Sequence, residues 1–386
     1  MNQTAPKGEV DQLNNWEAVM IKSSLRPTLY VSGVVSAALL TMTVWSKADA
    51  ADAESLYKKL ENLPPTERHA QLVAGARKEG KVVWYTTDAP RPTQVIFKAF
   101  NKKYPFVKTL FIRSKSRKIL DRVLTESRAG KHLFDLAKTS TETFNLYPVE
   151  KTFARYSSAA KNEIPSSMKG ERWTSLFTFI RAIGWNTQML AEKDVPKTWE
   201  DLLDPKWKGK ILFDQSSLPE VGVVYDNYGK EKGTALLDKL GSSGNLKLRR
   251  GRTQITQLLA AGDAPLAVTV YPYRVERMKK KGASIEWGLL NFTPGLLQPV
   301  SISRNAPHPY SAALLHDFLL SEAGQKVYAR MGRLPANPKV KTRNPKLGTA
   351  IKDPRLKIDR PDSAKSDAKV VLKLLDEKIL KKSFKK

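Results

Sequence analysis

Side chains able to hold an oxyanion are concentrated in four short loops of the sequence. Two loops read Thr86-Thr87-Asp88 and Thr139-Ser140-Thr141-Glu142, and the others span residues 214–217 and 249–253. Each loop follows a short apolar run and precedes an amphipathic one, which places it between a strand and a helix N-terminus. Helix N-termini present free N–H groups and a partial positive charge, so they favour anions. Serine and threonine also cap helices without any ligand. The recurrence at four junctions favours an oxyanion site over capping alone.

A regular alternation of strands and helices would position the first two loops. Short β-branched and aromatic runs predict strands, and segments with apolar residues at helical spacing predict the helices between them. In the first half the expected strands are 81–87, 107–112 and 134–137, and the expected helices are 66–79, 93–103 and 116–129. This β-α-β-α-β order is typical of a mostly parallel sheet with helices on both faces.

The second half continues the alternation and carries the other two loops. Two strand-like pieces lie within residues 173–186. The further expected strands are 211–214, 266–271, 285–287 and 300–303, and the expected helices are two within 221–240, then 253–261, 275–281, 309–320 and 322–331. The pattern predicts an α/β protein whose compact part closes near Met331.

The composition excludes several kinds of chemistry. The 386 residues include no cysteine, which excludes disulfides, thiolate zinc sites, iron–sulfur clusters and cysteine nucleophiles. None of the motifs GxSxG, HExxH or GxGxxG occurs, so we expect no enzyme; an envelope enzyme would need a paired acid and base. The 66 lysines and arginines against 38 acids give a charge of +28, which raises a nucleic-acid-binding protein as a further alternative.

The N-terminal region has the three parts of a secretory signal peptide. Residues 29–45 form an apolar run, preceded by Lys22 and Arg26 and followed by the small-residue site Ala48-Asp49-Ala50. We expect residues 1–50 to be a signal region with Met20 as an alternative start, and export to the periplasm. An uncleaved membrane anchor is the alternative, although the run is at the short limit for a bilayer span.

The C-terminal region differs in composition from the rest of the chain. Residues 336–386 carry 16 lysines and arginines and six acids, a net charge of +10, with few aromatic residues. This composition predicts a partly disordered basic tail with a terminal helix at 368–380. A solvated charged face is the plain interpretation. Weak contact with anionic lipid headgroups is the alternative.

Four segments occur in an order that is typical of one protein family. They read ARKEGKVVWYTT (76–87), VPKTWEDLLDPKWKGKI (195–211), LLAAGDAPLAV (258–268) and HPYSAALLHDFLLSEAGQKVYARMGRLPAN (308–337). Together they resemble the extracellular solute-binding proteins of bacterial ABC importers, in the branch grouped with ferric-iron-binding proteins. The resemblance spans about 270 residues, from Glu67 to Pro338.

This resemblance implies the architecture and the partners. It implies a two-lobed type II periplasmic-binding-protein fold, with the ligand in a cleft between the lobes. Lobe one would comprise residues 66–180 plus about 300–338, lobe two 181–299, and the basic tail 339–386. The protein would be a monomer that captures a small molecule or ion and delivers it to ABC permease membrane subunits. No nucleic-acid partner is expected.

The loops and the resemblance together indicate a small anionic solute or a ferric complex as the ligand. Hydroxyl-rich loops supply hydrogen bonds to an oxyanion, and arginines of lobe two would neutralise its charge. The expected ligand-binding residues are Thr86, Thr87, Ser140 and Thr141 from lobe one, and Ser216, Arg252, Tyr273 and Arg274 from lobe two.

Bare ferric iron is the alternative ligand that the resemblance implies. The ferric branch uses a histidine after strand one, a glutamate after strand three and an adjacent tyrosine pair. Here the first loop has no histidine, Ser140 occupies the place of the glutamate, and Pro272 separates the tyrosines. The candidate metal ligands are therefore Tyr271, Tyr273 and Glu142, with aromatic packing as the alternative role of the two tyrosines. We expect no resident cofactor, and iron would enter only as transported ligand.

Overall fold

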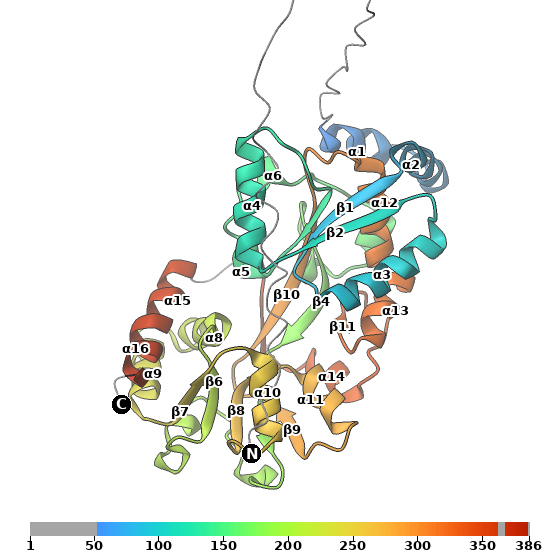
Figure 1. Ribbon diagram of the computed structural model, residues 1–386. Coiled ribbons are helices and arrows are strands. Elements are labelled where there is room, and N and C mark those ends of the chain that lie inside the picture. Colours follow the sequence, from blue (N-terminus) through green and yellow to red (C-terminus); the bar gives the residue numbers. More distant parts are fainter. Residues whose placement is uncertain (1–51, 362–366, 385–386) are drawn as a thin grey trace, which may run out of the picture. The chain divides into compact units, whose positions relative to one another are not determined.

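The computed structural model describes residues 52–361 and 367–384. The expected signal region and its start at Met20 lie outside these residues. Within the described part, two separate β-sheets are each flanked by helices (Figure 1). No helix of this part is long and apolar enough to cross a membrane.

The first sheet has the strand order β11-β4-β10-β3-β1-β2, and β12 pairs with β10. Strand β1 is parallel to both β2 and β3, whereas β10 is antiparallel to β3 and β4. The strands are β1 (Lys81–Thr86), β2 (Lys108–Arg113), β3 (Leu136–Lys138), β4 (Thr174–Ile180), β10 (Thr293–Ile302), β11 (Leu334–Pro335) and β12 (Leu356–Asp359).

The second sheet has the strand order β7-β6-β8-β5-β9. Strand β6 is parallel to β7 and β8, and β5 is antiparallel to β8 and β9. The strands are β5 (Ala182–Asn186), β6 (Ile211–Asp214), β7 (Leu246–Arg249), β8 (Leu266–Val270) and β9 (Ile285–Gly288). The two-lobed α/β fold is thus confirmed.

Both sheets are mixed, which corrects the expectation of mostly parallel sheets. The β-α-β units do form parallel strands in each sheet. The antiparallel pairs come from strands that connect the lobes: β4 leads directly into β5 through Arg181, and β10 returns to the first sheet. A chain that crosses to a second sheet and comes back must run in the opposite direction. Because β10 begins at Thr293, residues 293–299 belong to the first sheet, whereas the sequence places them in the second lobe.

The helices largely follow the expected apolar periodicity. α2 begins with Pro65 and ends at Gly80, whose φ of 68° is left-handed and suits glycine. The main helices are α1 (Ala53–Glu61), α2 (Pro65–Glu79), α3 (Pro90–Lys103), α4 (Ser116–Arg128), α5 (Thr141–Phe144), α6 (Val149–Thr152), α7 (Ala159–Asn162), α8 (Leu218–Tyr228), α9 (Lys230–Ser242), α10 (Arg252–Ala260), α11 (Pro272–Lys279), α12 (Pro309–Leu320) and α13 (Glu322–Arg330). Short 3₁₀ turns lie at Ser166–Met168, Glu192–Asp194, Glu200–Leu203 and Pro205–Trp207.

The C-terminal segment packs against the body, although its composition predicted a tail. α14 (Pro345–Ala350) precedes β12, which joins the first sheet beside β10. α15 (Ala368–Leu374), a π-helical turn (Leu375–Leu380) and α16 (Lys381–Phe384) then contact α8 and α9 of the second lobe. The physical reason is an apolar stripe that is buried against that lobe, formed by Val371, Leu374, Leu375 and Ile379.

Candidate functional site

The connection between the two sheets carries a half-buried arginine whose Nε and Nη1 atoms are buried. Arg181 is the residue between β4 and β5, and its guanidinium carbon lies 4.6 Å from the centre of the Tyr271 ring. Tyr271 is the last residue before α11, and its ring lies 4.9 Å from that of Phe179 in β4. The contact is a cation–π interaction, which a desolvated position strengthens. The strand crossing therefore brings a cation to the tyrosines predicted from the sequence.

A second arginine covers the neighbouring tyrosine. The guanidinium carbon of Arg333, just before β11, lies 4.0 Å from the ring centre of Tyr273 and 4.6 Å from that of Phe179. Arg274 lies 5.4 Å from the same Tyr273 ring. The two tyrosine rings are 5.5 Å apart. Arginines from the connection between the sheets, from α11 and from the turn before β11 thus converge on one group of aromatic rings. We call this group the arginine–aromatic cluster (Arg181, Arg274, Arg333, Phe179, Tyr271 and Tyr273).

A buried lysine borders this cluster on the side of the first sheet. Lys138, at the end of β3, donates hydrogen bonds to Asp88 Oδ1 at 2.9 Å and to Thr87 Oγ1 at 3.0 Å. Burial lowers the pKa of Lys138, and the nearby Arg333 lowers it further, whereas Asp88 raises it. Lys138 therefore has one close anionic partner in an otherwise cationic neighbourhood.

Several individual donor atoms of the arginine–aromatic cluster are buried with no hydrogen-bond acceptor among residues 52–361 and 367–384. They are Nε and Nη1 of Arg181, Nε of Arg274 and Nη1 of Arg333. A buried donor without an acceptor costs about 1–3 kcal/mol. An anion placed here would accept these hydrogen bonds, and planar guanidinium groups match carboxylate and phosphate oxygens.

Ser216 and Arg252 form a separate group at the start of α8. Ser216 Oγ donates to Asp214 Oδ1 at 2.6 Å, and Arg252 Nη2 donates to the Ser216 carbonyl oxygen at 2.9 Å. Arg252 also lies 3.7 Å from Asp214 and 3.9 Å from the fully buried Glu220. Burial raises the pKa of Glu220 to about 7, whereas Arg181 lowers it. Much of the Arg252 charge is therefore offset by carboxylates of its own lobe.

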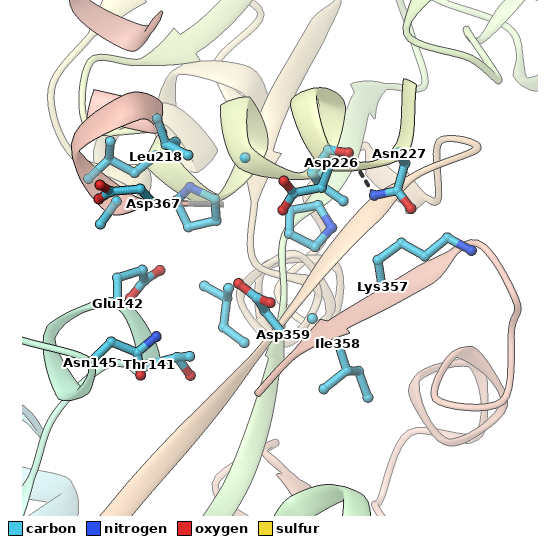
Figure 2. A pocket seen from close by; sticks show the side chains of 18 of the residues that line it. Thr141, Glu142, Asn145, Leu218, Asp226, Asn227, Lys357, Ile358, Asp359 and Asp367 are labelled. Carbon is cyan, nitrogen blue, oxygen red and sulfur yellow. Dashed lines mark hydrogen bonds between the residues drawn. The ribbon is translucent and has the colours of Figure 1, made fainter. Parts of the chain in front are cut away.

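A cavity of about 380 Å³ lies between the lobes (Figure 2). α5 lines it from the first lobe and α8 from the second, while the C-terminal residues Lys357–Asp359 and Asp367–Val371 form a further wall. The carboxylates of Glu142, Asp226 and Asp359 point toward the same space (Figure 2). Glu142, which lines the cavity, also interacts electrostatically with Arg181 of the arginine–aromatic cluster and with Glu220. None of the six residues of the cluster lines the cavity itself.

The predicted site residues fall into three groups. The arginine–aromatic cluster contains three of them, Tyr271, Tyr273 and Arg274. Thr87 lies at the border of this cluster, where its Oγ1 accepts a hydrogen bond from Lys138. Thr141 and Glu142 line the interlobe cavity. Ser216 and Arg252 form their own group.

The remaining lobe-one hydroxyls have partners within the protein. Thr86 Oγ1 accepts from the Asp88 backbone N–H at 3.1 Å, Ser140 Oγ bonds to Thr143 Oγ1 at 3.2 Å, and Thr141 Oγ1 donates to the Leu297 carbonyl oxygen at 3.1 Å. Helix capping by the side chain, the alternative to an oxyanion site, does not occur at Ser140 or Ser217.

Sequence patterns did not identify three cations of the site, Lys138, Arg181 and Arg333. Arg181 is a single charge within the apolar run TSLFTFIRAIGWN, and Lys138 ends the apolar strand LAK. A lone charge in a buried run needs a partner or a ligand, which is a signal that could have identified both. Arg333 has no such signal, because it lies in a turn between α13 and β11.

The surroundings of the candidate iron ligands do not favour metal binding. Burial raises the pKa of the Tyr271 phenol, which opposes the phenolate that a ferric ion needs, while Arg181 lowers it. Within the described residues, no group of three or more histidine, aspartate or glutamate side chains is arranged to hold a metal ion.

Solved structures with the same architecture include several binding proteins. Iron-bound HitA from Pseudomonas aeruginosa is similar with a TM-score of 0.65 and 18% identity, over 77% of this chain and 98% of that one. FutA from Trichodesmium, in complex with iron and citrate, has a TM-score of 0.63 and 19% identity, over 77% and 98%. AfuA from Actinobacillus pleuropneumoniae, bound to fructose-6-phosphate, has a TM-score of 0.61 and 21% identity, over 77% and 97%. These identities establish a shared fold.

Sequence similarity establishes the family. A protein of Haemophilus influenzae, described as uncharacterized, is 28% identical over 282 residues, which is 67% of this chain and 78% of that protein. The family model of the bacterial extracellular solute-binding proteins matches residues 112–356, which is more than half of the chain and includes β3 to β11, Arg181 and both tyrosines. The chain belongs to the family of bacterial extracellular solute-binding proteins.

Proposed function

We propose that this solute-binding protein captures a small solute through an anionic group held by the arginine–aromatic cluster. The observation that carries the proposal is the set of buried guanidinium donors without acceptors in Arg181, Arg274 and Arg333. Because Arg181 and Arg274 come from the connection and second lobe while Arg333 comes from the first, an anion here would contact both sides of the cleft. A ligand that contacts both lobes favours the closed arrangement.

The neighbouring cavity limits the kind of anion. Its lining includes the carboxylates of Glu142, Asp226, Asp359 and Asp367 against one lysine, Lys357. A second anionic group in this cavity would meet a negative field. We infer that the solute carries its negative charge at one end and is neutral or cationic at the other.

We infer the cellular role from the family. An extracellular solute-binding protein with this fold would work in the periplasm, exported by the N-terminal signal region, and deliver its solute to the membrane permease of an ABC importer. The support for these finer points is the family match together with the N-terminal apolar run.

Calorimetric titration tests the proposed ligand class. The probes are inorganic phosphate, a sugar monophosphate, the matching bisphosphate and a polyamine. We expect the monophosphate to bind and the bisphosphate to bind more weakly. Binding of the polyamine alone would overturn the anion proposal.

A matched pair of variants on α11 locates the site. Arg274→Gln removes a buried donor of the cluster and should weaken monophosphate binding about 10- to 100-fold, as expected for a charge-assisted hydrogen bond. Arg277→Gln changes an exposed arginine of the same helix and should leave affinity unchanged. Equal affinity of both variants would contradict the assignment.

Ferric iron, alone or as a complex, is the second candidate ligand. The observation that favours it is the closeness of the Tyr271 and Tyr273 rings, 5.5 Å apart. Elemental analysis of purified protein and visible absorbance after addition of ferric citrate would test it. An iron–tyrosinate absorbance band that Tyr273→Phe abolishes and Tyr225→Phe retains would establish iron binding. If the band is absent and phosphate esters bind, the ligand is an organic anion and not ferric iron.

A further inference from the structure

One surface of the first lobe has a much higher density of positive charge than the second lobe. Residues 91–131 contain twelve lysines and arginines and two acids, a net charge of +10 in 41 residues. All twelve basic residues are exposed. The second lobe over residues 181–299 carries a net charge of only +5. We call this surface the α3–β2–α4 face.

The three elements of this face lie at one end of the first sheet. β2 is the last strand in the order of that sheet, and Figure 1 shows α3 on one side of the β2 edge and α4 on the other. Lys108 and Arg113 mark the two ends of β2 and are both exposed. The charges of the two helices and the strand therefore form one rim around a sheet edge.

Most of these charges have no ion-pair partner in the part of the chain that the structure describes. Among the described residues, only Arg117 and Arg122 of this face form ion pairs, with Asp121 at 3.9 Å and Glu126 at 2.6 Å. Like charges gathered on one face repel one another. An external polyanion that neutralises such a surface lowers its electrostatic free energy.

Apolar side chains on the same face favour a lipid surface over a nucleic acid. Val95 on α3 is 45% exposed and Leu110 on β2 is 40% exposed, and Leu133, just beyond the face, is 46% exposed. Bilayer interfaces accept exposed apolar side chains beside lysines and arginines. Single-stranded nucleic acids are bound through cations and stacked aromatic rings, and the aromatic residues of this segment are buried or half-buried. Duplex DNA needs only the cations, so binding experiments must separate it from lipid.

We propose that the α3–β2–α4 face binds a membrane surface rich in anionic lipid headgroups. The proposal goes beyond solute capture and does not depend on the identity of the solute. It moves the membrane contact from the C-terminal segment to the first lobe. Each lysine or arginine near such a surface strengthens binding about fivefold at low salt, and the effect decreases as salt screens it.

Co-sedimentation with vesicles tests this proposal. The full chain is mixed with phosphatidylcholine vesicles, with or without phosphatidylglycerol. We expect binding only to the anionic vesicles and a steep loss with added salt. Replacing Lys102, Lys108, Lys115 and Lys118 by glutamine should weaken binding more than about tenfold.

Two control variants separate this face from overall charge and from the C-terminal segment. The first replaces Lys193, Lys197, Lys208 and Lys210, four exposed lysines of the second lobe, by glutamine. The second replaces Lys369 and Lys373, exposed on α15, by glutamine. We expect each control to retain most of the binding. If the first control loses as much vesicle binding as the variant of the α3–β2–α4 face, net charge alone explains the binding. If the second control loses vesicle binding, the C-terminal segment makes the membrane contact. Either result overturns the proposal.

A final comparison decides between lipid and nucleic acid. Leu110→Ser should weaken binding to anionic vesicles while leaving affinity for duplex DNA unchanged. Tighter binding to DNA than to vesicles, with no effect of Leu110→Ser on either, would show a general polyanion surface and reject the membrane assignment.

Discussion

Two regions of this protein carry the same net charge of +10 and place it differently, residues 91–131 and residues 336–386. Four C-terminal lysines face acids of the body. Lys339 lies 2.9 Å from Glu163, Lys346 lies 2.9 Å from Glu286, and Lys378 and Lys382 lie 3.1 and 2.6 Å from Asp238. On the α3–β2–α4 face the acids are two neighbours on the same helix.

Charge density alone therefore does not identify an interaction surface. Basic residues with acidic partners in other elements attach their own segment to the protein. Basic residues without such partners remain available to an external anion. The C-terminal segment thereby becomes part of the wall of the interlobe cavity, whereas the α3–β2–α4 face is directed outward.

The largest expected effect concerns the docking of the C-terminal helices. A Cβ at Gly241 would lie 1.8 Å from the Lys378 carbonyl oxygen, so Gly241→Ala should displace that segment and cost about 1–3 kcal/mol of unfolding free energy. Gly222→Ala is the matched control, because its Cβ would lie 3.7 Å from Val371, an ordinary contact. Thermal unfolding and limited proteolysis near α15 provide the measurement. Equal stability of the two variants would show that the segment is not closely packed.

The next effect concerns the ion pairs themselves. Asp238→Asn removes two cross-element partners of the C-terminal segment and should lower the free energy of unfolding by about 1 kcal/mol, since these pairs are partly exposed. Asp121→Asn removes the single 3.9 Å pair within α4 and should change stability very little. Chemical denaturation of both variants measures the contrast. A larger loss for Asp121→Asn would reverse the comparison of the two regions.

A smaller effect appears at acidic pH. The hydrogen bond from Lys382 lowers the pKa of Asp238, and Lys378 lowers it further, against the opposing effect of burial. A carboxyl group with a lowered pKa stabilises the fold fully above its unfolded pKa of about 3.9, and this contribution is lost as pH falls through the folded pKa. Hydrogen exchange of α15 amides, corrected for intrinsic rates, should show increased opening below about pH 4. Asp238→Asn should lack this change, and an unchanged pH dependence in that variant would assign it to other groups.

The smallest effect is expected on the α3–β2–α4 face. Replacing Lys102, Lys108, Lys115 and Lys118 by glutamine should leave the free energy of unfolding within about 0.5 kcal/mol, because exposed unpaired charges contribute little. Relief of repulsion would make any change stabilising at low salt. Denaturant titration at two salt concentrations measures it. A clear loss of stability would show that these lysines have structural partners.

Local patterns predicted much of the fold. The expected strand 211–214 coincides with β6, and the expected helix 309–320 coincides with α12, because short apolar runs and helical periodicity are read within one segment. α1, β7, β12 and the mixed direction of the sheets were not predicted. Pairing and direction depend on strands far apart in the chain, and β12 is stabilised by β10 about 60 residues earlier.

The candidate site was predicted only in part, because contacts between residues far apart in the chain leave no local pattern. The resemblance to the ferric branch pointed to Tyr271 and Tyr273, and Arg274 was a candidate for its positive charge; the structure places the three in one cluster. Their cationic neighbours Arg181 and Arg333 come from distant segments, so no local motif joins them. Lys138 and Asp88 are likewise 50 residues apart before the fold brings them to 2.9 Å.

Local sequence patterns were enough to establish the class of the protein: an α/β chain without cysteine chemistry, with hydroxyl-rich loops after its strands and the segments of a solute-binding family. Which charges have partners became visible only in the folded protein. Ion pairing and burial depend on distances between residues remote in the chain, and a sequence lists charges without those distances. For that reason the basic C-terminal segment is a packed part of the protein, and a basic stretch of the first lobe is the exposed surface.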